Sequence, residues 1–102
     1  MAGFFEVVHS RLQAGAEDAM LALRPAFVAA MRSAAPGLLA AQLVRLDDGT
    51  WLDIVEWESR EAAEAGIAAH HSVPEAAEMG RHVSEILAMH QGVPTEPVPS
   101  GR

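Results

Sequence analysis

The sequence predicts an α+β fold with one antiparallel β-sheet and helices on one sheet face. Four short segments rich in aromatic, leucine and β-branched residues are typical of strands: residues 4–12, 38–46, 51–58 and 85–91. Apolar residues recur with helical spacing after the first and the third of these segments. A tight turn joins the second and third as a hairpin. The resulting order, β-α-β-β-α-β, is the ferredoxin-like or split βαβ arrangement.

The N-terminal part is predicted to contain a strand and a long helix. Residues 4–12 (FFEVVHSRL) roughly alternate, and His9 lies on the same side as two apolar residues. The helix is expected to begin near Glu17, whose negative charge suits a helix N-terminus, and to stop at Pro36-Gly37. Pro25 lies inside this pattern. Because proline lacks a backbone donor, we expect a kink or a new first turn there.

The centre of the chain is predicted to be a hairpin. Residues 38–46 also suit a helix by composition, but they lie between a Pro-Gly pair and the Asp-Asp-Gly turn at 47–49, which favours a strand. The turn leads into the most strand-like run, residues 51–58. Side chains two residues apart share a strand face. One face therefore carries two indoles around a carboxylate: Trp51, Asp53, Val55 and Trp57.

The C-terminal half is predicted to contain an interrupted helix and a last strand. Ser59 is a suitable N-cap for a helix over residues 60–69. Pro74 suits the first turn of a continuation that runs to about Ser84. Residues 85–91 then alternate as a strand. We expect the first and third strands to be central neighbours and the last strand to lie beside the second.

Length and composition indicate one domain. The chain has 102 residues, half of them hydrophobic, which is enough for a modest core. We expect residues 1–91 to form a single ferredoxin-like domain. Residues 92–102 contain three prolines and are expected to form an extended C-terminal tail.

Charge and cysteine content exclude several classes of function. Fourteen acidic residues face seven basic ones, all arginine, and the net charge is -7. We therefore expect no nucleic-acid partner and no binding to anionic membranes. Without cysteine there is no disulfide framework, thiolate nucleophile or cysteine metal site. No signal peptide or apolar run of about 20 residues is visible, so a cytoplasmic protein is expected.

The strands are apolar on both faces, as the pairs Val7-Val8, Leu43-Val44 and Ile54-Val55 show. Helices on one side of the sheet can cover only one face. A second copy of the sheet is the natural cover for the other, so we predict a homodimer in which two sheets meet face to face.

Several short motifs resemble the antibiotic biosynthesis monooxygenase superfamily across roughly residues 4–91. The third strand ends in apolar-x-Trp-x-Ser, and the Ala-rich helix after it is broken by a Ser-Val-Pro step. The motifs are Gly15, Pro36-Gly37-Leu38-Leu39, the Asp48-Gly49 hairpin, Val55-Glu56-Trp57-Glu58-Ser59 and Ser72-Val73-Pro74. The resemblance implies a dimeric α+β barrel. It also implies an activity: oxygenation of a small aromatic or polyketide-like compound with no cofactor, by a monooxygenase or a related proton-transfer enzyme.

The functional residues of the family are only partly matched in this chain. Trp57 matches a tryptophan of the polyketide oxygenases, whereas Asp53 stands where they have asparagine and Ala63 about where they have tyrosine. The haem-degrading branch uses three functional residues. Its asparagine corresponds to a position near Val8 or His9 of this chain, its tryptophan to Gly66, and its histidine to a position near Glu78. None of these three is present, so haem degradation is not expected. The chain looks closer to an uncharacterised subgroup with Trp-x-Asp-x-Val-x-Trp in the third strand.

Asp53 is the main catalytic candidate. Between two indoles it would be partly desolvated, which favours the neutral carboxyl and suits a general base for an acidic phenol or enol. The alternative is a structural ion pair with Arg45 across the hairpin. His9 and His90 are candidate catalytic partners of Asp53, because a carboxylate can orient an imidazole as a base near neutral pH.

Four residues are candidates for substrate binding. Trp57 stacks on a planar ligand or is simply a core residue, and Trp51 is a pocket wall or a dimer contact. Val55 lies between them. His71, with His70, is either a helix-end residue or the lip of the pocket. A Glu78/His82 pair has helical i,i+4 spacing but lacks a third metal ligand, so no metal site is expected.

Two functions of different classes follow from these observations. The first is a cofactor-independent monooxygenase, or a related proton-transfer enzyme, acting in a pocket between sheet and helices. The second is a non-catalytic dimeric domain of the same fold that binds a small molecule or only itself. A pocket lined by Trp57, Asp53 and a histidine favours the first, and a filled core favours the second.

Overall fold

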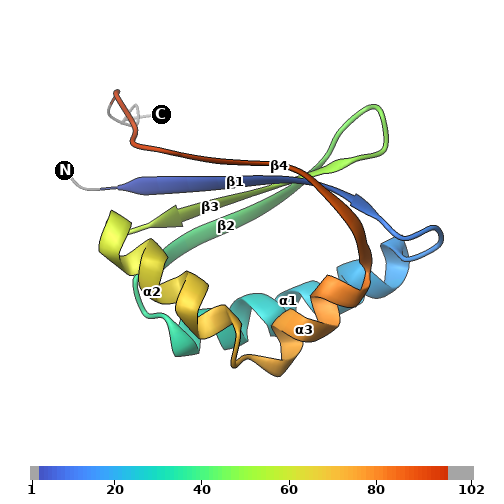
Figure 1. Cartoon of the computed structure of the whole chain (residues 1–102), viewed down its shortest axis with the longest axis horizontal. Helices are drawn as coiled ribbons and strands as arrows, with labels where there is room; N and C mark the ends of the chain where they lie inside the picture. Colours follow the sequence, from blue (N-terminus) through green and yellow to red (C-terminus); the bar gives the residue numbers. More distant parts are fainter. Residues whose placement is uncertain (1–2, 97–102) are drawn as a thin grey trace, which may run out of the picture.

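A computed structural model describes residues 3–96, and the elements lie in the predicted order (Figure 1). The second helical segment is divided into two helices. The elements are β1 (Phe4–Leu12), α1 (Glu17–Ala34), β2 (Leu38–Arg45), β3 (Trp51–Trp57), α2 (Arg60–His70), α3 (Pro74–Arg81) and β4 (Val83–Gly92). The last strand begins two residues earlier than predicted. Of the expected tail, residues 97–102 lie outside the described part of the chain.

The four strands form one antiparallel sheet in the order β2-β3-β1-β4. β1 and β3 are central neighbours, as predicted. The prediction for β4 was wrong, since β4 pairs with β1 instead of β2. Both helical connections cross one intervening strand: β1 reaches β2 across β3, and β3 reaches β4 across β1. β4 therefore takes the far edge of the sheet.

Within residues 3–96 the three helices lie on one side of the sheet, and the other sheet face carries no helix (Figure 1). α1 is a single helix from Glu17 to Ala34 with Pro25 inside it, so the prediction of a new first turn at Pro25 was wrong. Proline has no N–H to donate to the carbonyl group of Leu21, one turn earlier. The helix tolerates this loss because Pro25 is exposed, so that the Leu21 carbonyl can bond to water. None of the helices in residues 3–96 is long and apolar enough to cross a membrane.

The hairpin turn forms as predicted. Gly49 has a φ of +87°, a left-handed conformation that favours glycine. The Asp48 side chain accepts hydrogen bonds from the backbone N–H and the hydroxyl group of Thr50, at 2.9 and 2.6 Å. Thr50 is buried, and its Oγ1 lies 2.7 Å from Nε2 of His9 on β1. The turn is therefore tied to the central strand.

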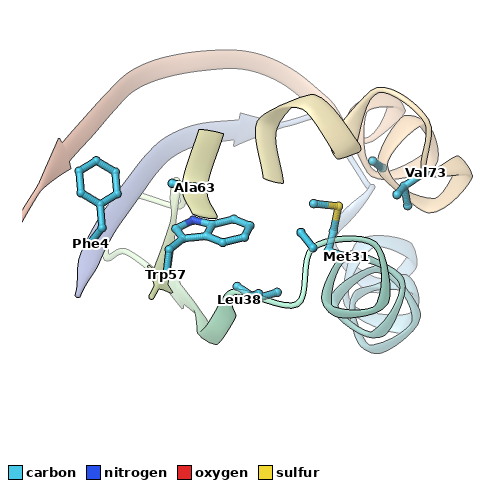
Figure 2. Packing of buried hydrophobic residues seen from close by; sticks show 8 residues of the cluster. Phe4, Met31, Leu38, Trp57, Ala63 and Val73 are labelled. Atoms are coloured by element: carbon cyan, nitrogen blue, oxygen red, sulfur yellow. The ribbon is translucent and has the colours of Figure 1, made fainter. Parts of the chain in front are cut away.

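The main hydrophobic cluster surrounds the indole of Trp57, between the sheet and α2 (Figure 2). It comprises Phe4, Met31, Ala35, Leu38, Trp57, Ala63, Val73 and Ala76. Ser59 caps α2 as predicted, accepting a bond from the Ala62 N–H at 3.0 Å. Gly66 faces the indole so closely that any Cβ there would overlap the ring. Only glycine lets α2 approach the sheet at this point.

Candidate functional site

A cavity of about 550 Å³ lies between the sheet and the helices, within the range of small-molecule sites. The sheet forms its floor, with Glu6, Val8, Trp51, Asp53, Val55 and Trp57 among the lining residues. The helices form its roof, with Met20, Arg24, Phe27, Met31, Ile67 and His70 among the lining residues. The lining is mostly apolar, and its polar residues come from both layers, Glu6 and Asp53 from the floor and Arg24 and His70 from the roof. The space between sheet and helices is thus not filled by side chains.

Asp53 forms a two-pronged ion pair with Arg24 of α1. The Nη1–Oδ2 and Nη2–Oδ1 distances are both 2.7 Å. The side chains retain only 12% and 26% of their exposure, for Arg24 and Asp53 respectively. The sequence suggested, as one alternative, an ion pair between Asp53 and Arg45. Asp53 does form an ion pair, but its partner is Arg24, and Arg45 instead donates a hydrogen bond of 2.8 Å to Glu17. Arg24 therefore engages both carboxylate oxygens of Asp53.

Glu6 is a second carboxylate on the cavity floor, and it is only 8% exposed. β1 pairs Glu6 with Val55, which places Glu6 diagonally beside both Asp53 and Trp57. Burial raises the pKa of Glu6 above its ordinary value. The nearby indole N–H of Trp57 acts in the opposite direction, and the negative charge of Asp53 adds to the increase in the pKa.

The indole N–H of Trp57 is a buried donor without a partner within residues 3–96. The side chain is 3% exposed. The N–H lies near enough to the Glu6 carboxyl to favour its charged form, but the two groups do not meet the geometry of a hydrogen bond. A buried donor left unpaired costs about 1–3 kcal/mol. The floor therefore offers one donor and one carboxyl that a ligand could satisfy.

The four predicted binding residues all line the cavity: Trp51, Val55, Trp57 and His71. Their roles as ligand contacts stay predictions. His70 lines the cavity too, and its ring lies edge-on to Phe27 with centroids 6.1 Å apart. Burial lowers the pKa of His70, and the neighbouring His71 adds to this. Both histidines are partly exposed and stand at the helical rim of the cavity.

His9 and His90 lie on the sheet face opposite Asp53. Residues that face each other across an antiparallel pair share a sheet face. Asp53 is opposite Val8, whereas His9 is opposite Leu52 and His90 is opposite Val7. The predicted dyad of Asp53 with either histidine is therefore absent from this chain. His9 contacts Thr50 instead.

Glu6 and Arg24 were not singled out by the sequence analysis, although each carries a signal. Glu6 lies on the same strand parity as Phe4 and Val8, so a charge interrupts an apolar face. Arg24 follows Met20 by four residues and precedes Met31 by seven, which places it inside the apolar stripe of α1. A charged residue on a buried face points to a partner or a site.

No three side chains of His, Cys, Asp or Glu within residues 3–96 gather in a way that could hold a metal ion. At Gly66, where the resemblance places the tryptophan of the haem-degrading branch, the indole of Trp57 leaves no room for a side chain. The polar groups that meet around Asp53 are thus the carboxylates of Asp53 and Glu6, the guanidinium of Arg24 from α1 and the indole N–H of Trp57.

A sequence profile described as "Antibiotic biosynthesis monooxygenase" matches residues 3–79. A search of curated protein sequences finds no match. Solved structures with similar folds include Rv0793 from Mycobacterium tuberculosis, with a TM-score of 0.73, 19% identity, and coverage of 96% of this chain and 100% of that one. SnoaB from Streptomyces nogalater, a cofactor-independent oxygenase, has a TM-score of 0.69 and 18% identity over the full length of both chains.

A third similar structure is a monooxygenase from the gene ActVA-Orf6 of Streptomyces coelicolor, in complex with the ligand Nanaomycin D. It has a TM-score of 0.72 and 20% identity, and the match covers 96% of this chain and 92% of that one. At such identities the three structures establish a shared fold.

The ion pair of the cavity floor predicts unequal costs for two arginine substitutions. Arg24→Met leaves the partly buried Asp53 carboxylate without its partner, so we expect a loss of about 1–3 kcal/mol in the free energy of unfolding. Arg45→Met breaks a pair whose side chains are 58% and 41% exposed and should cost less than about 1 kcal/mol. Urea unfolding measures both. Equal losses would contradict a structural role for the Arg24–Asp53 pair.

Proposed function

Because the chain belongs to the antibiotic biosynthesis monooxygenase family, we propose that it is a cofactor-independent monooxygenase acting on a small aromatic or polyketide-like compound. The observation that supports this most is the cavity of about 550 Å³, whose lining is mostly apolar with a small number of polar residues. A planar apolar ligand fits such a lining, and the indoles of Trp51 and Trp57 offer surfaces at opposite ends of β3.

The chemistry needs little from the protein. A methylene carbon of such a ligand loses two hydrogens and gains one oxygen atom from O2 as a carbonyl, while the second oxygen atom leaves as water. The ligand supplies all four electrons that reduce O2, two for each oxygen atom, so the balance is complete without a further reductant. The protein supplies a base that removes the first proton, an orientation for the resulting anion, and a cavity that limits water.

The Arg24–Asp53 pair is assigned to binding the ligand. As a base, Asp53 would have to give up one of its two bonds to Arg24. The two bonds use two of the five N–H donors of the guanidinium, so Arg24 has others to offer to a ligand oxygen. Asp53 fixes the direction in which they point. The enolate or phenolate oxygen would then lie beside a positive charge.

Asp53→Asn and Asp47→Asn test this function with an oxygen electrode and a panel of hydroquinones and anthrones. The wild type should consume oxygen with at least one compound. Asp53→Asn should lower the rate about 100-fold because Arg24 loses its fixed direction, whereas Asp47, exposed in the hairpin turn, should be replaceable without effect. No uptake with any compound would contradict the proposal and favour a non-catalytic binding domain. Full activity of Asp53→Asn would contradict the assignment of the Arg24–Asp53 pair to binding the ligand.

The proposal includes a homodimer through the sheet face that carries no helix. Members of the family are typically dimers. In one chain this face presents half-buried apolar side chains, Val7, Val44, Leu52 and Ile54 among them. A second copy would cover them and bring the two sheets together. Light scattering should therefore give about twice the chain mass of 10.8 kDa, and a mass of one chain would contradict the dimer.

A further inference from the structure

We infer that Glu6, on the cavity floor diagonally beside Trp57, is the catalytic base of the cavity, the group that takes the first proton from the bound ligand. This rests on the proposed function, because it assigns a role within the same cavity. It names a residue that the sequence pattern did not single out, in place of Asp53 and the two histidines.

The position of Glu6 supports this role. Glu6 lines the cavity from β1, although the residue is only 8% exposed. Within residues 3–96 its side chain makes no ion pair, and the nearby Trp57 N–H does not meet the geometry of a hydrogen bond to it, whereas both oxygens of Asp53 bond to Arg24. A base must have a free oxygen within reach of the proton that it removes. Of the two floor carboxylates, Glu6 meets this condition.

The surroundings of Glu6 suit a group that changes its charge during the reaction. Burial favours the neutral carboxyl, and the Asp53 carboxylate across the floor does the same. The Trp57 N–H opposes both by favouring the charged form. Their net effect raises the pKa of Glu6, which brings it closer to that of an enol or phenol and makes proton transfer less unfavourable.

The other charged and titratable groups around the cavity do not replace Glu6. From α1, Arg24 is paired with Asp53. From α2, His70 and His71 stand at the exposed rim. From β4, Glu85 lines the cavity with an exposed side chain, and its Oε1 lies 3.9 Å from Nε of Arg11. Glu6 is therefore the one carboxyl within residues 3–96 that is both buried in the cavity wall and free of an arginine partner.

The step balances as a single proton transfer. The C–H or O–H bond of the ligand breaks, its electron pair stays on the ligand, and the proton passes to a carboxylate oxygen of Glu6. The negative charge moves from Glu6 to the ligand, where the free donors of Arg24 can stabilise it. Glu6 becomes the neutral acid that its buried position favours.

Anaerobic proton exchange tests the role of Glu6 separately from the reaction with oxygen. The probe is anthrone, whose methylene protons are acidic, incubated with the protein in D2O under argon. Deuterium incorporation is followed by mass spectrometry. The wild type should exchange these protons faster than buffer, and Glu6→Gln should lower the enzyme-dependent rate by about 10²–10⁴-fold. Glu6→Asp should restore part of it, and Glu64→Gln, at an exposed position of α2, should leave it unchanged.

The pH dependence of the exchange rate distinguishes a catalytic role of Glu6 from a purely structural one. The exchange rate should fall as the pH drops through the raised pKa of Glu6, because the protonated carboxyl cannot accept a proton. Glu6→Gln should lose this acid limb. A wild-type rate no faster than buffer, or equal rates for wild type and Glu6→Gln, would overturn the assignment. Exchange that depends on Glu6 without oxygen uptake would sustain it and refute the oxygenase function.

Discussion

The packing of the Trp57 indole against Gly66 is the contact on which the rest of the structure depends. It fixes how closely α2 approaches the sheet, and the main hydrophobic cluster forms around the same ring. The opposite end of the indole carries the N–H near Glu6. One side chain therefore holds the layers together and also sets the polarity of the cavity floor. A larger residue at position 66 would have to displace the ring, and the environment of Glu6 with it.

The cavity has a cost in stability. The free energy of folding comes from close packing, yet a space of about 550 Å³ stays open between the layers. A buried carboxyl without an arginine partner and a buried N–H without an acceptor add to this cost. The open space, the Glu6 carboxyl and the Trp57 N–H, each unfavourable in an ordinary hydrophobic core, thus occur together at the cavity. Such local conflicts are expected at a functional site, where a ligand can resolve them.

The fold could be predicted from local patterns, but the sheet faces could not. The hairpin at Gly49, the Ser59 cap and the helical stripe of α1 are local signals, and the structure contains all three. Both faces of the strands are apolar, so alternation alone did not show which face the helices cover, and His9 was assigned to the side of Asp53. On β4, Ala88 pairs with His9 and Ile86 pairs with Ser10, so Leu87 between them has no partner on β1. This irregularity shifts the alternation of the strand, and a regular alternation therefore assigns His90 to the wrong sheet face. Arg24 was missed because its partner lies 29 residues away in sequence.

The central claim, that burial holds Glu6 toward its neutral form, is tested most directly by the pH dependence of stability for wild type and Glu6→Gln. A carboxyl whose folded pKa is raised contributes stability at low pH that is lost as the pH rises through that pKa. Glutamine has nearly the same shape and does not titrate. Glu6→Gln should therefore gain stability relative to the wild type from acidic to neutral pH, and then level off. A difference that is constant with pH, or that falls as the pH rises, would contradict the account.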